Sequence, residues 1–414
     1  FYSLTIDNIL NIVILIILAT VTINIAFGED GLIARAQQAK ELTEQATKDE
    51  QEALNSLIDQ YDSIISGNGT TPEEPEEPKT PIEEIKGQIQ DDTLKVENVP
   101  IDSDGENPDA TGTIYVPGGF GIDEDSPNDI NDGIIISNAD DTKQFVWIPV
   151  SSEELAEMYV EAPGTELSSA LEMDTVSTDV YSKLRDETDN GNSFYDTSTY
   201  KPGTTSHREP DILTSTSNGD ASSSNLATIK SVFATELAEY GINSASSDAQ
   251  VLNAWAQMLV DEYNETYQSV KKYGGFYIGR YEISGSVESP TVEQGGTVLD
   301  ASVAGNWYNL KKACNNVVNN EYVKSEMIYG NQWDRVLSWL VETGAKTQEQ
   351  VDSDSSSWGN YSNSSGAAAT DSGTPQTSGK NPAWKANNIY DLAGNYYEFT
   401  QYAFSESSRI ARGR

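Results

Sequence analysis

The chain begins with a long apolar stretch that carries no charge. From Asn8 to Phe27 there is no Asp, Glu, Lys or Arg. About 20 helical residues, rising roughly 1.5 Å each, match the hydrocarbon thickness of a bilayer, so this stretch is expected to enter a membrane as a helix. Asp7 precedes it and Glu29 follows it, which is unlike the positive flank of a secretory signal. The chain opens on Phe1 rather than Met, so we expect that a leader has been removed.

A second periodic pattern follows the GEDG break at residues 28–31. Apolar and alanine residues recur there every three, four or seven positions, which predicts one stripe along a helix. Lysine and glutamate alternate every four residues from Lys40 to Glu52, so charges on successive turns can pair. Residues 1–65 are therefore predicted to form one long helix of about 90 Å, which needs neighbours because a single chain cannot bury it.

This start resembles the type IV pilins and pseudopilins, and the segment LIILATVTINIAFGEDGLIARAQQAKE resembles those of clostridial, Gram-positive surface proteins. The resemblance implies a filament whose core is built from copies of this helix, with subunit contacts at Phe1, Asp7, Ile14, Ile17 and Val21. The family usually has Glu at the fifth position, where this chain has Thr5. We therefore expect Asp7 to pair with the terminal amine of a neighbouring subunit. The alternative is an ordinary single-pass membrane anchor.

The composition is strongly acidic, with 25 Lys and Arg against 66 Asp and Glu and a net charge of -41. Nucleic acid and anionic membrane surfaces are therefore unfavourable partners. The densest acidic run, DEDSPNDINDG at 123–133, could recruit calcium, but it lacks the ligand order of an EF-hand loop. Solubility of a surface protein is the alternative explanation of the charge.

Cysteine and histidine are each present once, as Cys314 and His207. A single cysteine excludes an internal disulfide, and the pair excludes the usual zinc sites and most cysteine or serine nucleophile arrangements. The secreted part must then be stabilised by the size of its core.

The remaining sequence divides at a segment in which Pro alternates with Glu. Residues 66–85 are predicted to be an extended spacer. Residues 86–414 are predicted to form a globular domain with an irregular insertion at about 185–225. Within that domain we expect helices at 227–240 and 248–272 and short strands at 112–116, 133–136, 145–149 and 276–281.

Several motifs of this domain resemble, in order, the formylglycine-generating-enzyme family, whose fold is a variant of the C-type lectin fold. They are FVWIPV, GGFYIGRYE, NWYNLKKACNN, MIYGNQWDRVLSWL, SSWGNYS and NIYDLAGNYYEFT. The two resemblances together imply an α+β fold class: a long N-terminal α-helix, then a C-type lectin-like domain with little regular structure.

The second resemblance also implies site residues. In the family, the turn that matches Gly394–Glu398 helps to bind calcium, so Asn395 and Glu398 are candidate calcium ligands, and no other cofactor is expected. A hydrogen-bonded structural turn is the alternative. The family's enzymes need a late cysteine pair that binds copper, which this chain lacks, so we expect no enzymatic activity. Tyr396, Tyr397 and Tyr402 are candidate ligand contacts, because tyrosine and serine suit an adaptable binding surface.

The sequence thus predicts a structural subunit of an extracellular type IV pilus-like filament that displays a non-catalytic, lectin-like domain for adhesion or ligand binding. It would lie in the cytoplasmic membrane before assembly and on the cell surface afterwards. The expected partners are copies of itself and a glycan or cell-surface ligand, with no nucleic acid. The alternatives are a membrane-anchored enzyme of the formylglycine-generating type and a surface receptor that does not polymerise.

Overall fold

The computed structural model describes residues 79–102, 109–158, 220, 222–352, 355–369, 373–405 and 408–413, together with Lys48. The chain divides into two units, Phe1–Pro78 and Lys79–Arg414. The elements below all belong to the second unit.

A four-stranded antiparallel sheet lies at the centre of this unit. Its order is β3 (Phe120–Ile122), β4 (Ile135–Asn138), β5 (Gln144–Pro149) and β6 (Gly275–Gly279). Alternate residues of the two middle strands enter different hydrophobic clusters. Ile136 and Trp147 join one cluster, whereas Ile135 and Val146 join the other. The middle strands are apolar along their whole length because both faces of the sheet are covered.

A hairpin of β1 (Leu94–Pro100) and β2 (Thr111–Val116) contributes to the first of these clusters. Val96, Val99, Ile114 and Val116 are all buried there. The register shifts between Val96 and Val99, where Asn98 has a φ of 57°. Asparagine tolerates this left-handed conformation better than most residues, so it suits an irregular point in the strand.

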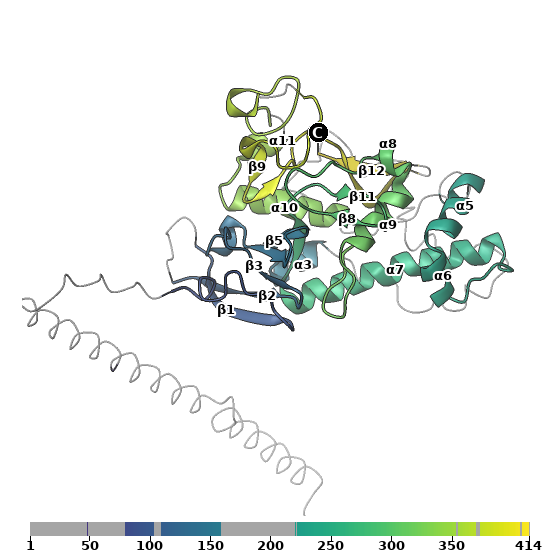
Figure 1. The fold of residues 1–414 in the computed structure, drawn as a ribbon, viewed down its shortest axis with the longest axis horizontal. Helices are drawn as coiled ribbons and strands as arrows, with labels where there is room; N and C mark the ends of the chain where they lie inside the picture. Colours follow the sequence, from purple (N-terminus) through teal and green to yellow (C-terminus); the bar gives the residue numbers. More distant parts are fainter. Residues whose placement is uncertain are drawn as a thin grey trace, which may run out of the picture. The chain divides into compact units, whose positions relative to one another are not determined.

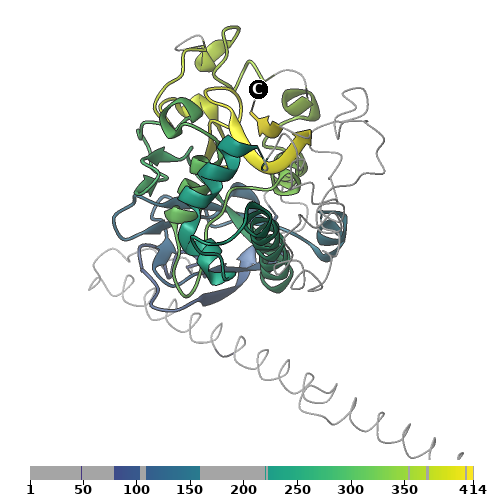
Figure 2. The ribbon, with the colours of Figure 1, turned by 90° about the vertical axis from the view of Figure 1, so that its right-hand side faces the viewer.

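Helix α7 (Asp248–Tyr273) is the longest described element, with 26 residues. A capping box of Ser247 and Gln250 begins it, and Gly274, at a φ of 69°, ends it and leads directly into β6. Its apolar face buries Trp255 and Tyr263 in a third cluster. Figures 1 and 2 show α5 (Ser223–Val232) and α6 (Ala234–Glu239) grouped around it. The same cluster includes residues of α9 (Trp307–Val317).

Helix α10 (Gly330–Glu342) covers the other face of the sheet through Trp333, Val336, Trp339 and Leu340. Figure 1 shows it between the sheet and the C-terminal hairpin, which consists of β11 (Glu398–Ser405) and β12 (Ser408–Arg412). Three short α-helices remain among the described residues: α3 (Ser152–Met158), α8 (Ala301–Ala304) and α11 (Gln348–Asp352). The described part also contains three 3-10 turns: η1 (Ile130–Asp132), η3 (Gly366–Ala368) and η4 (Pro382–Trp384). Two short strand pairs complete the described elements: β7 (Ser284–Gly285) with β8 (Pro290–Thr291), and β9 (Lys385–Ala386) with β10 (Ile389–Tyr390).

The fold class predicted from the sequence is wrong. The described residues form a mixed α and β architecture with eight α-helices and five small sheets, not a domain with little regular structure. The physical reason lies in the aromatic residues and the helix caps. Trp255, Trp333 and Trp339 lie on amphipathic helices and pack into clusters between helices and sheet.

The long apolar N-terminal helix predicted for residues 1–65 lies outside the described part of the chain, apart from Lys48. Within the described part, no helix combines the length and the apolar character needed to cross a bilayer.

Several local predictions are confirmed. The strands expected at 112–116 and 145–149 are β2 and β5, and the helix expected at 248–272 is α7. The single helix expected at 227–240 is instead two helices: α5 ends just before Phe233, and α6 begins just after it. Phe233 is fully buried and its ring packs 4.8 Å from that of Trp255, so a tertiary contact fixes the position of the break.

Candidate functional site

Of the two candidate calcium ligands, Asn395 lies on a tight turn that follows β10, and Glu398 is the first residue of β11. Gly394 and Asn395 have φ angles of 78° and 61°. A Cβ atom on Gly394 would lie 2.4 Å from the carbonyl oxygen of Asn360, so only glycine fits. The Asn360 backbone pairs with this turn through its amide, which donates to the Ala393 carbonyl at 2.9 Å. The Gly359-Asn360 and Gly394-Asn395 pairs therefore lie side by side in one structure.

The side chain of Asn395 is fully engaged with protein groups. Its Nδ2 donates to Glu282 Oε2 at 2.6 Å and to the Gln376 carbonyl at 3.2 Å. Its Oδ1 accepts from Asn360 Nδ2 at 3.1 Å and from the Gln376 amide at 2.8 Å. A metal ion could use this oxygen only by displacing two hydrogen bonds.

Three acidic side chains lie close to one another beside the turn: Glu282, Asp391 and Glu398. Asp391 is fully buried, and its Oδ2 accepts from the Gly379 amide at 2.7 Å and from Ser378 Oγ at 3.2 Å. Burial raises the pKa of Asp391 to about 6, although the two hydrogen bonds act in the opposite direction and lower it. Burial, followed by repulsion from Asp391, raises the pKa of Glu282 well above its usual range. Burial and repulsion from Glu282 do the same to the pKa of Glu398.

Two oxygens of this group are buried and make no hydrogen bond to the described residues. They are Asp391 Oδ1 and Glu398 Oε2. The described residues nevertheless contain no group of three or more His, Cys, Asp or Glu side chains arranged to hold a metal ion. Glu398 thus has an oxygen that a cation could use, whereas Asn395 does not offer one in this arrangement. All three carboxyl groups therefore hold their protons to a higher pH than exposed carboxyl groups do.

The candidate ligand contacts Tyr396 and Tyr397 lie on the same turn. The side chain of Tyr397 is 54% exposed. Tyr396 is half-buried, and its amide donates to Glu282 Oε1 at 3.2 Å. The third candidate, Tyr402, belongs to β11, but its side chain lies outside the described part. The structure therefore brings Tyr396 and Tyr397 together beside the carboxylates.

The five candidate subunit contacts, at Phe1, Asp7, Ile14, Ile17 and Val21, all lie outside the described residues, as does His207. Cys314 lies within them, packed against the cluster around α7. Burial raises the pKa of its thiol to about 12, so it remains a thiol at neutral pH.

The acidic run at 123–133 is used for local structure. Asp129 caps η1 by accepting from the Asn131 amide at 2.7 Å, and Asp123 accepts from the Asp125 amide at 2.9 Å. These contacts are typical of Asx turns. They account for two of the carboxylates of the run without a cation.

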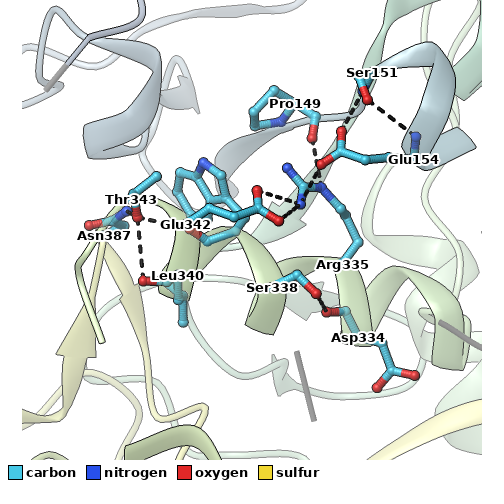
Figure 3. Close-up of polar contacts among 11 residues, drawn as sticks. Pro149, Ser151, Glu154, Asp334, Arg335, Ser338, Leu340, Glu342, Thr343 and Asn387 are labelled. Carbon is cyan, nitrogen blue, oxygen red and sulfur yellow. Dashed lines mark hydrogen bonds and ion pairs between the residues drawn. The ribbon is translucent and has the colours of Figure 1, made fainter. Parts of the chain in front are cut away.

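The motif that contains α10 forms an anchoring network, shown in Figure 3. Arg335 lies between Glu154 of α3 and Glu342 of its own helix, at 2.6 and 2.8 Å, and its Nε donates to the Pro149 carbonyl at 3.1 Å. The preceding residue, Asp334, pairs with Arg412 of β12 at 3.4 Å. Both partners of this second pair are buried. The motif therefore joins α3, β5 and the C-terminal hairpin.

Sequence reasoning missed a hollow of about 780 Å³ beside α7. Its lining combines tyrosines and carboxylates, among them Tyr115, Tyr240, Tyr273, Tyr277, Asp261, Glu262, Glu265 and Glu326. The signal in the sequence was the acidic group at 261, 262 and 265 on a helix whose other face is apolar. Lys312 and Lys324 also line the hollow, and each pairs with a glutamate there, Glu236 and Glu265 respectively.

Comparisons with known proteins give no relative: no family model, no curated protein and no solved structure matches this chain. Function must therefore be argued from the chain's own residues.

Proposed function

We propose that this protein is the structural subunit of an extracellular, type IV pilus-like filament and that it displays its folded unit for adhesion or ligand binding. One observation carries the proposal: an uncharged apolar segment, residues 8–27, is joined to a large acidic folded unit through a segment rich in Pro and Glu. An apolar segment of this length has to leave water, and burial between identical copies removes it from both water and lipid. Self-association is thus the principal interaction.

The displayed unit binds without catalysis in this proposal. The only cysteine is Cys314, so the copper-binding cysteine pair of formylglycine formation has no counterpart. The side-chain oxygen and nitrogen of Asn395 are occupied by hydrogen bonds within the protein. The exposed ring of Tyr397 beside this rigid turn supports a role in contacting a glycan or another cell-surface ligand.

Calcium at Asn395 and Glu398 is a separate part of the proposal. Glu398 Oε2 has no hydrogen-bond partner among the described residues, which favours a cation, whereas Asn395 Oδ1 already accepts two hydrogen bonds. If calcium binds there, adding millimolar calcium should raise the melting temperature of the wild-type protein but not that of Glu398→Gln. Equal melting temperatures with calcium and with a chelator would limit this site to a structural turn.

Charged substitutions in the apolar segment test assembly. Ile14→Asp or Ile17→Asp should abolish filaments, because a carboxylate would be buried in an apolar subunit contact. A matched control is Ile89→Asp, since Ile89 is already 41% exposed in the folded unit. Electron microscopy of sheared surface material should show filaments for the control only. Filaments of normal yield from Ile17→Asp would contradict the proposal, and wild-type protein that remains monomeric in detergent would favour a non-polymerising receptor.

A further inference from the structure

Lys311 is the only lysine of the described residues that is buried, and its side chain is fully inaccessible to solvent. Helix α9 carries it into the protein, whereas the next residue, Lys312, keeps 22% of its side chain exposed. A buried ammonium ion is costly unless several groups stabilise it, so its neighbours define what this amine can do.

Two side chains contact the Lys311 amine directly. Its Nζ lies 2.5 Å from Glu262 Oε2 of α7 and donates to Gln401 Oε1 of β11 at 3.0 Å. Gln401 is 1% exposed, and its Nε2 donates to the Met327 carbonyl at 2.8 Å. Since a carbonyl bond is about 1.2 Å long, Lys311 Nζ is no more than about 4.2 Å from Gln401 Cδ. This approaches the separation of about 3–3.5 Å at which bound groups react.

The carboxylates beside this amine can accept its proton. Asn315 Nδ2 holds the other oxygen of Glu262 at 3.2 Å. Burial and the nearby charge of Glu262 raise the pKa of Glu326 to about 8. Glu326 accepts a hydrogen bond from Thr266 and immediately precedes Met327, whose carbonyl holds the Gln401 amide. Glu262, at 2.5 Å, is placed to take one proton from the Lys311 ammonium, and loss of that proton supplies the lone pair that a nucleophilic amine needs.

We propose that Lys311 and Gln401 become joined by an isopeptide bond. The Lys311 ammonium first gives one proton to Glu262. The Nζ lone pair then attacks Gln401 Cδ, a new bond forms between these atoms, and the bond from Cδ to Nε2 breaks. Of the three protons on the Lys311 ammonium, one stays on the new amide nitrogen. The other two pass through Glu262 to the departing nitrogen, which leaves as an ammonium ion. The exchange of one amide bond for another needs no oxidant, reductant or further reactant.

This bond would tie α9 covalently to the C-terminal hairpin. The chain has one cysteine and so has no internal disulfide to restrict this hairpin. Closing the loop from 311 to 401 would restrict the unfolded chain in the way that a disulfide does. It would also keep the turn that carries Tyr397, just before β11, attached to the helical part. The inference concerns covalent maturation and does not depend on filament formation.

Peptide mapping of the purified full chain tests the proposal. After denaturation and trypsin digestion, mass spectrometry should find one branched peptide that joins the segments containing Lys311 and Gln401. Its mass should be lower by one ammonia than the sum of the two linear peptides, and cleavage after Lys311 should be absent. Lys312→Arg, the matched control, should retain the branched peptide, whereas Lys311→Arg should give linear peptides only.

Two results would overturn the proposal. One is a wild-type digest in which both segments are linear, with cleavage after Lys311. The other is a loss of ammonia that persists in Lys311→Arg, which would place the loss at another amide. The wild-type digest decides the question even if Lys311→Arg does not fold.

Discussion

The carboxylates around Asn395 and those around Lys311 differ in burial and in partners: Glu282 and Asp391 are buried, whereas 21% of the Glu262 side chain is exposed. Glu282 and Asp391 accept hydrogen bonds from amides and a hydroxyl, and the described residues supply no ion pair to either. Glu262, by contrast, contacts the buried ammonium of Lys311. The first network has no positively charged partner among the described residues, so its contribution to stability should depend on pH. The second contains one lysine, so its contribution should depend on that side chain.

The largest effect on stability should come from Lys311→Met. In a chain that has not formed the bond to Gln401, the substitution leaves Glu262 without the buried cation, and breaking such a pair costs about 3–5 kcal/mol of unfolding free energy. In the joined chain it removes the cross-link, which costs about 2–5 kcal/mol. Urea unfolding followed by tryptophan fluorescence measures it. The control is Lys324→Met, whose pair with Glu265 is about two-thirds exposed and should change stability by only about 0–1 kcal/mol. Equal losses of unfolding free energy in Lys311→Met and Lys324→Met would contradict the expectation that the buried lysine stabilises the fold more than the exposed one.

The network around Asn395 should make the unfolding free energy depend on pH, by an amount similar to or smaller than the effect of Lys311→Met. The folded pKa of Asp391 is about 6 and its ordinary value is 3.8, so the folded protein binds more protons between these values. Its stabilising contribution is complete below pH 4 and is lost as the pH rises to above 6, by on the order of 3 kcal/mol. Unfolding free energies measured across this range should therefore fall with rising pH.

Asp391→Asn sharpens this test. An asparagine oxygen can still accept from Gly379 and Ser378, and the amide nitrogen carries no charge to repel Glu282. The variant should be at least as stable as the wild type at pH 7 and should show a weaker pH dependence between 4 and 6. An unchanged slope would place the titrating group elsewhere, for instance at Glu326, whose pKa is raised to about 8.

Local patterns in the sequence predicted part of this architecture correctly. The caps and apolar stripe of α7 and the short apolar runs of β2 and β5 depend on neighbours in sequence, so they could be predicted. The turn at Asn395 was expected as well, from the motif that contains Gly394 and Asn395. Its partners Glu282 and Asn360 lie 113 and 35 residues away, so their contacts depend on tertiary packing.

Lys311 shows the limit of such reasoning. A lysine on an amphipathic helix is ordinarily expected at the surface. Only the approach of α7 and β11 in the folded protein gives it a carboxylate and an amide, 49 and 90 residues away. The mixed architecture was missed for a similar reason, since motif resemblance said nothing about how α5, α6 and α7 pack together.

The smallest effect on stability should come from Tyr397→Ala. Its side chain is 54% exposed, so unfolding free energy should change by about 0.5 kcal/mol or less. If Tyr397 contacts a ligand, binding to a glycan or cell-surface array should nevertheless weaken. Tyr322→Ala is the control, because Tyr322 is also partly exposed but does not belong to the turn. Equal binding by the wild type and both variants would remove Tyr397 from the binding surface.

Immunogold electron microscopy of surface filaments tests the central claim most directly. Antibodies raised against residues 86–414 should label filaments along their whole length, because every subunit would display its folded unit outward. Ile17→Asp cells should show no labelled filaments while still producing the protein. Label confined to the cell envelope, with no labelled filaments from wild-type cells, would contradict the claim that this chain is a filament subunit.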